Sequence, residues 1–149
     1  MGINAASVVV AHCRCRSTVL ASFLLDRIDI HLETRPLSEK ELSSPANAEN
    51  SATIQQRVEA ARLVQQERFK APRTNDSLQP AEMQVHCKLD SAGQSLLSQA
   101  VNSLDLSARA YDRILRVART IADLEGERHI LPEHIGEAVQ YRALDRKLW

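Results

Sequence analysis

The chain has 149 residues, with 44% hydrophobic but only 3% aromatic side chains, and it carries no formal net charge. A neutral balance gives no overall electrostatic attraction to nucleic acid or to a membrane surface, and the composition favours helices packed through aliphatic side chains over a β-sandwich. The 3 cysteines form no even disulfide framework, which indicates a reducing cytoplasm. No apolar run approaches the roughly 20 residues that cross a bilayer, so no membrane partner is expected.

The first residues of the chain contain part of a metal-binding pattern. His12, Cys13 and Cys15 stand close together, and a C-x-C pair can clamp a metal ion through two thiolates. A closed zinc site needs four ligands, and the remaining cysteine, Cys87, lies far away in the sequence. We therefore predict no metal site, and a small metal-binding protein is the weakest functional hypothesis.

Residues 24–33, LLDRIDIHLE, have the pattern of a half-buried strand. Apolar and polar side chains alternate with a period of two, the apolar ones being Ile28, Ile30 and Leu32. His31 has no visible partner and is expected on the exposed face. The polar residues 34–52, rich in Ser, Pro, Asn and Glu, then read as a linker.

Three helices are predicted in the middle of the chain. The first covers 53–71, with Ser51 or Thr53 as its cap and a buried stripe of apolar residues at helical spacing, formed by Ile54, Val58 and Ala61. A short helix follows from Pro80 to about residue 87, in which Cys87 is a small core residue without chemistry. A third runs from about 91 to 103, capped by Asp90 or Ser91.

The last part of the chain, residues 104–149, has the most consistent local signals. Ser107 is a good N-cap for a helix that runs to about residue 125, and Gly126 stands where a C-cap glycine belongs. Pro132 fits the first turn of a second helix, because its missing N–H costs nothing there. Both segments have apolar faces at helical spacing, so we expect the two helices to pack against each other.

Arginines line the first of these two helices. Arg109 lies in its first turn, where the helix dipole disfavours a cation, and Arg113 follows four residues later on the same face. Arg116 and Arg119 have acidic residues four positions away, Asp112 and Asp123. A cation at a helix start is explained if an anion such as a phosphate docks there. The alternative is a solvated stripe on the outer face of an amphipathic helix.

The stretch LSARAYDRILRVARTIADLEG, followed by LPEHIGEAVQYRALDRKLW, resembles the C-terminal domain of magnesium-chelatase-like AAA+ ATPases of the YifB/ComM family. The resemblance implies an all-α fold, the small helical lid of such ATPases. It also implies that Arg109 is the sensor-2 arginine that reaches the nucleotide phosphates, with Arg113 as a second candidate. The segment LLDRID is similar to the last motif of the AAA+ core, which implies that Arg27 is an arginine finger acting in trans on a neighbouring subunit.

The resemblance also implies partners that complete the site. No G-x-x-x-x-G-K-[ST] motif is present, so the chain is not expected to hydrolyse ATP alone. The expected partners are an AAA+ core and the neighbouring subunits of a cytoplasmic homo-hexamer. ATP and Mg²⁺ would bind the complete motor and neither is expected to bind this chain tightly. DNA is a further candidate partner, because ComM-type proteins are linked to branch migration and natural transformation.

We therefore predict three regions: an end of the AAA+ core with an orphan strand over 1–33, a linker over 34–52, and a helical lid over 53–149. Residues 51–149 should fold without the rest, because the orphan strand lacks its sheet. The alternative function is a stand-alone module that binds protein or DNA through a basic strip from Arg109 to Arg119. Residues 107–149 hold eight basic and seven acidic residues, which argues against strong DNA binding by that strip.

Overall fold

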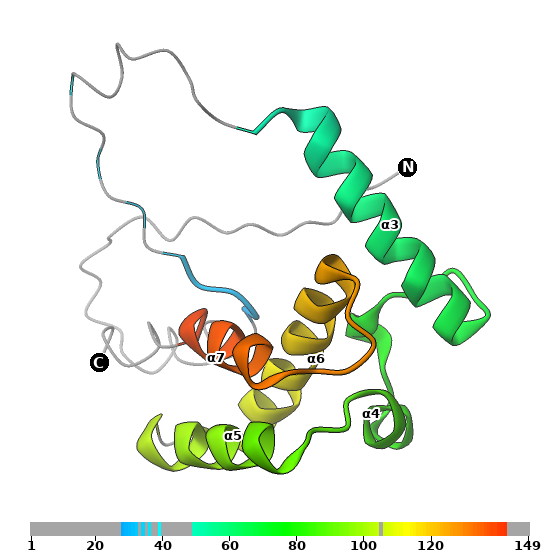
Figure 1. Cartoon of the computed structure of the whole chain (residues 1–149). Helices are drawn as coiled ribbons and strands as arrows, with labels where there is room; N and C mark the ends of the chain where they lie inside the picture. The colour runs from blue at the N-terminus through cyan, green and yellow to red at the C-terminus, as the bar shows by residue number, and fades with distance from the viewer. Residues whose placement is uncertain are drawn as a thin grey trace.

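The computed structural model describes residues 28–32, 34, 36, 39, 49–104 and 106–142. In these residues the regular structure is helical and no strand is present (Figure 1). The elements that lie completely within the described ranges are five α-helices and one 3-10 turn: α3 (Ser51–Phe69), η1 (Asn75–Ser77), α4 (Pro80–His86), α5 (Ser91–Leu104), α6 (Ala108–Glu125) and α7 (Pro132–Gln140). The expected all-α bundle is confirmed.

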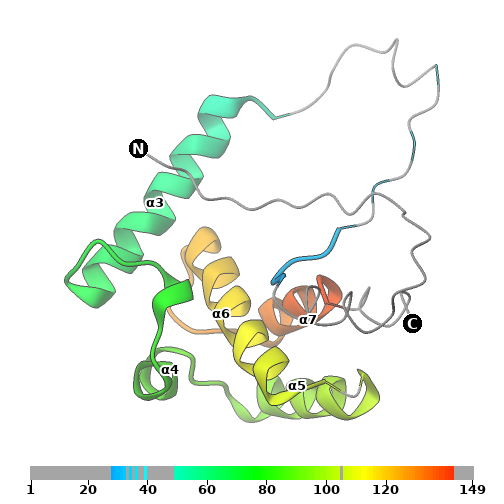
Figure 2. The same cartoon turned by 180° about the vertical axis from the view of Figure 1, so that it is seen from behind.

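Helix α6 is the centre of the bundle. It contacts α3, η1, α4 and α7, while α5 packs against α7, and the views from both sides show α6 between α3 and α7 (Figures 1 and 2). Most of its apolar face is buried, as the spacing predicted, while Tyr111 is partly buried. That face and α7 supply much of the core, including Ile114, Ala118, Ile121, Ile135 and Ala138.

The ends of the helices are set by local capping contacts. The Ser107 side chain accepts a hydrogen bond from the backbone N–H of Ala110 at 3.2 Å, and Gly126 ends α6 in the left-handed region with φ of 76°, as predicted. Helix α3 differs, because its N-cap is Asn50 rather than Ser51 or Thr53. The Asn50 side chain accepts from the Thr53 N–H at 2.8 Å, which satisfies one of the free donors of the first turn.

The N-terminal half of α3 projects beyond the bundle (Figure 1). Only Ala61 and Gln65 of this helix are buried. Ile54 and Val58 were predicted to be buried with Ala61 but are 42% and 36% exposed, so that part of the prediction is wrong. Their spacing is helical as expected, but α6 covers only the C-terminal half of α3, and spacing does not reveal how long the partner surface is.

The strand predicted over 24–33 is not present in its described part, residues 28–32. The burial is also inverted, since Ile30 and Leu32 are 46% and 69% exposed while His31 is 8% exposed. A strand needs a neighbouring strand to complete its ladder. The His31 N–H instead donates to the carbonyl of Tyr141 at the end of α7, at 2.9 Å. The expected exposure of His31 is therefore also wrong.

None of the helices in the described part of the chain is both long and apolar enough to cross a membrane. The division into regions 1–33, 34–52 and 53–149 stays a prediction.

Candidate functional site

Arg109 is the second residue of α6, and its side chain is exposed. The first N–H groups of any α-helix lack partners within the helix, and here the Ser107 side chain satisfies that of Ala110. Arg109 therefore stands where the positive end of the helix dipole and a guanidinium can act on the same anion.

Arg113 lies one turn further along α6 and is half-buried. Its Nη1 atom forms an ion pair with Asp29 Oδ1 at 2.8 Å. Two more contacts hold the same segment: the hydrogen bond of His31 to Tyr141, and a hydrogen bond at 3.2 Å from Arg142 Nη1 to the carbonyl of Ile28. Residues 28–32 are thus attached to α6 and to the end of α7.

A groove of about 460 Å³ lies beside this attachment. We call it the α6–α7 groove; the side chains that line it include Asp29, Arg113, Arg116, Thr120 and Tyr141. Arg27 immediately precedes the attached segment but lies outside the described residues. The structure therefore brings Arg113 together with Asp29 of the segment 28–32, and the role predicted for Arg27 stays a prediction.

Arg116 and Arg119 do not form an exposed strip with Arg109. Arg119 is 1% exposed and forms the predicted ion pair with Asp123, at 3.0 Å. Arg116 Nη2 donates to the carbonyl of Leu78 at 3.0 Å rather than pairing with Asp112. The basic strip predicted for the alternative function is therefore wrong for Arg116 and Arg119, because their guanidiniums form contacts within the fold.

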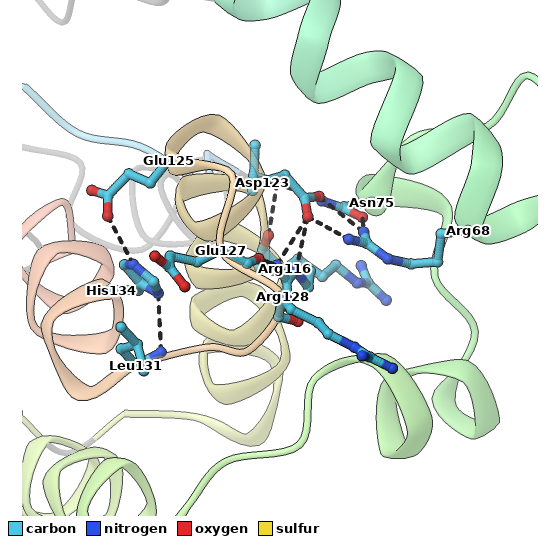
Figure 3. A network of polar contacts seen from close by, with 11 residues as sticks. Arg68, Asn75, Arg116, Asp123, Glu125, Glu127, Arg128, Leu131 and His134 are labelled. Atoms are coloured by element: carbon cyan, nitrogen blue, oxygen red, sulfur yellow. Dashed lines mark hydrogen bonds and ion pairs between the residues drawn. The ribbon is translucent and has the colours of Figure 1, made fainter.

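Asp123 is the centre of a buried polar network that joins α3, η1 and α6 (Figure 3). Its carboxylate accepts hydrogen bonds from both Nη atoms of Arg68, one of them at 2.9 Å. It also accepts from Asn75 Nδ2 at 2.8 Å and from Arg119 Nε at 3.1 Å. Burial alone would raise the pKa of Asp123, but the hydrogen bonds from Arg68 and Asn75 and the positive charges of Arg119 and Arg68 outweigh it, so the pKa lies below its ordinary value.

The network extends into the loop between α6 and α7. Arg119 Nη1 donates to the carbonyl of Arg128 at 3.0 Å, and Nη2 donates to the carbonyl of Glu127 at 2.6 Å. On the other side of the loop, His134 Nδ1 accepts from the Leu131 N–H at 3.0 Å, and its Nε2 lies 3.0 Å from Glu125. Because Nδ1 accepts, the imidazole carries its proton on Nε2 and donates to Glu125. Figure 3 shows the two contacts of His134, with Leu131 and with Glu125.

Sequence reasoning found the Arg119–Asp123 pair from its spacing but missed Arg68 and Asn75. Arg68 lies 55 positions before Asp123, so no local pattern joins them. The available signal was a pair of charged residues, Arg119 and Asp123, on the side of α6 that also carries buried apolar residues. Buried charges are paired, which indicates that such residues have partners on another element.

The remaining predicted features carry no chemistry or lie outside the described residues. Burial raises the pKa of the Cys87 thiol to about 11, so this thiol stays protonated at neutral pH and behaves as a core residue, as predicted. Within the described ranges, no group of three or more His, Cys, Asp and Glu side chains could hold a metal ion. His12, Cys13 and Cys15 lie outside those ranges.

Comparison with known proteins identifies the domain. Residues 48–142 match the family described as magnesium chelatase, subunit ChlI C-terminal. The chain belongs to this family. The matched range contains Arg109, Arg113 and the whole Asp123 network, whereas Arg27 and the segment 28–32 precede it.

Individual relatives of this magnesium chelatase C-terminal domain are similar over a longer range. The competence protein ComM of Haemophilus influenzae is 41% identical over 130 residues, which is 87% of this chain. The YifB proteins of Escherichia coli and Salmonella typhimurium are 42% and 41% identical over 131 residues. The chain spans about a quarter of the length of these curated relatives. The resemblance to the YifB/ComM family is therefore confirmed.

Proposed function

We propose that this domain is the lid of an AAA+ ATPase and that Arg109 is its sensor-2 residue, which contacts the phosphates of ATP. The exposed position of Arg109 in the first turn of α6 carries the proposal. A guanidinium there can bind a phosphate oxygen together with the helix N-terminus. Arg113 is half-buried and pairs with Asp29, and it is the second candidate for a phosphate contact.

Arg27 is proposed to act as an arginine finger on a nucleotide held by the neighbouring subunit of a homo-hexamer. The attachment of residues 28–32 to α6 and α7 supports this proposal. It couples the chain next to Arg27 to the helix that carries Arg109. A movement of the lid on ATP binding would then move the finger as well.

The fit of this domain to ATP and Mg²⁺ is partial. Arg109 provides one phosphate contact, and in the described part of the chain no cluster of acidic or histidine side chains suits a metal ion. In this proposal a P-loop core holds ATP and Mg²⁺, and the lid adds a positive charge at the phosphates. The proposed action on DNA, in branch migration or natural transformation in the cytoplasm, rests on the similarity to the competence protein ComM.

The test is ATP hydrolysis by the chain mixed with a P-loop core from a relative. The lid proposal requires that the chain stimulates turnover and that Arg109→Ala lowers the stimulated rate, by roughly a hundredfold if one charged donor to the phosphates is lost. The matched control is Arg62→Ala, which removes an exposed arginine from α3. Equal rates for the two variants in a mixture that hydrolyses ATP would contradict the role of Arg109.

A further inference from the structure

A second groove, of about 480 Å³, lies between the C-terminal half of α3, the end of α4 and the loop after α6. We call it the α3–α4 groove. It shares no lining residue with the α6–α7 groove. Most of its polar lining is basic: Arg68, His86, Lys88, Arg119, Arg128 and His129.

The α3–α4 groove has an excess of positive charge that the fold does not neutralise. Arg68 and Arg119 share the single carboxylate of Asp123. Lys88 and Arg128 are exposed, and their side chains have no carboxylate partner among the described residues. Glu127 is the one acidic residue of the groove lining. Four permanent cations therefore line the groove, and of the described carboxylates only those of Glu127 and of the buried Asp123 offset them, although the whole chain is neutral.

The backbone that presents Arg128 is held in place. Arg119 binds the carbonyls of Glu127 and Arg128, and Gly126 supplies the left-handed turn that starts the loop. Figure 3 shows the Arg128 side chain extending away from the network contacts. A fixed backbone lowers the entropy lost when Arg128 binds a ligand.

The chemistry of the groove favours phosphates over bases. The apolar lining residues are Val64 and Val85, which offer no flat face for stacking a base, and no aromatic ring is among the lining residues other than the imidazoles. The nearby ring of Phe69 packs edge-on against His86, with 5.9 Å between ring centroids. Base stacking on aromatic side chains is the usual means of holding nucleotides by their bases, and the only rings that line this groove are the small imidazoles of His86 and His129.

We propose that the α3–α4 groove binds the phosphodiester backbone of DNA, through Lys88 and Arg128 and without reading the bases. Charge contacts to phosphates supply sequence-independent affinity that falls steeply with salt. The proposal goes beyond the role of Arg109 in hydrolysis. It assigns to this domain a DNA contact on a different surface from the exposed start of α6 that carries Arg109.

The test is binding of the full chain to fluorescently labelled DNA oligonucleotides of two unrelated sequences, measured by anisotropy over a range of salt concentrations. Lys88→Ala and Arg128→Ala should each weaken binding about two- to fivefold. Each should reduce the slope of log affinity against log salt by about 0.7 to 0.9 if one phosphate contact is lost. Both sequences should respond equally. Arg62→Ala is the control for removal of an exposed cation outside the groove.

Removing a negative charge from the groove separates an effect on DNA binding from an effect on folding more sharply. Glu127→Gln removes the one carboxylate of the groove lining and should tighten DNA binding about two- to fivefold, which loss of folding cannot imitate. Thermal melting of each variant checks the fold. Lys88→Ala and Arg128→Ala variants that are folded and bind DNA like Arg62→Ala would overturn the proposal. So would equal competition by polyglutamate at matched charge, which would assign the groove to acidic peptides. Because ATP hydrolysis tests Arg109 separately, either proposal can fail without the other.

Discussion

Asp123 shows how a single residue holds together elements that are distant in sequence. Its carboxylate lies between Arg68 of α3 and Arg119 of α6, and it also binds Asn75 of η1. Asp123 is 3% exposed. If its negative charge is lost, little water is therefore available to solvate the two guanidiniums that it neutralises. Removing one partner from a buried charge cluster leaves an uncompensated charge.

We predict that Asp123→Asn lowers the free energy of unfolding by about 3 kcal/mol. The amide keeps the shape of the side chain but leaves Arg68 and Arg119 without a counter-charge. Chemical denaturation followed by circular dichroism measures the loss. Asp112→Asn is the matched control, because Asp112 is an exposed acidic residue on the same helix and its change should be within about 0.5 kcal/mol. Equal losses for the two variants would contradict the network.

The pH dependence of stability tests the same residue independently. The pKa of Asp123 is lower in the folded protein than its ordinary value. Its contribution is therefore fully present above the unfolded pKa, near 3.9, and is lost as the pH falls through the folded pKa. The difference in stability between the wild type and Asp123→Asn should shrink on acidification. A constant difference down to the acid transition would show that the charge is not responsible.

At the scale of elements, α6 and α7 are predictable because their signals are local. Ser107, Gly126 and Pro132 mark helix ends through capping and backbone preferences that involve only their neighbours. The buried face of α3 is harder to predict from the sequence, because Ile54 and Val58 have helical spacing but no partner surface in the described part of the chain covers them. Residues 28–32 are attached to Tyr141 and Arg142. Ile28 and Arg142 lie 114 positions apart in the sequence, so no local sequence pattern encodes the attachment.

Two glycine-to-alanine substitutions test whether α6 ends at Gly126. Their expected effects on the free energy of unfolding have opposite signs. Gly126 has φ of 76°, and an added Cβ there would meet nothing within 4 Å. Gly126→Ala should therefore destabilise only through the left-handed backbone, by about 1 kcal/mol. Gly136, inside α7, also has open space around a Cβ, so Gly136→Ala should stabilise by up to about 1 kcal/mol. Thermal or chemical denaturation measures both. A stabilising Gly126→Ala would mean that α6 does not end in this conformation.

At the scale of the whole molecule, the predicted site residues fall in two regions. One region lies inside the range that matches the family, and the other precedes it. Arg109 and Arg113 lie within the range that matches the magnesium chelatase C-terminal family. Arg27 precedes that range and the described residues. Ile30 and Leu32, which follow it in the sequence, are exposed apolar side chains that a neighbouring sheet would cover, which agrees with the proposed connection to an AAA+ core.

The described contacts refine where an independently folding unit should begin. The sequence places the start at residue 51, but Asn50 caps α3 and Glu49 pairs with Arg57 at 3.1 Å. We predict that residues 49–149 and 51–149 both give helical circular dichroism and cooperative melting. The shorter unit should lose protection from hydrogen exchange in the first turns of α3, where removing the cap costs about 1 kcal/mol.

The loss should stay local, because the N-terminal half of α3 makes little contact with the bundle and Ile54 and Val58 are exposed. Protection in α6 should be the same in both units, since its core contacts with α7 and the Asp123 network remain intact. Loss of cooperative melting in both units would show that residues 1–48 contribute to the core. Equal protection of the first turns of α3 would show that Asn50 does not act as the cap.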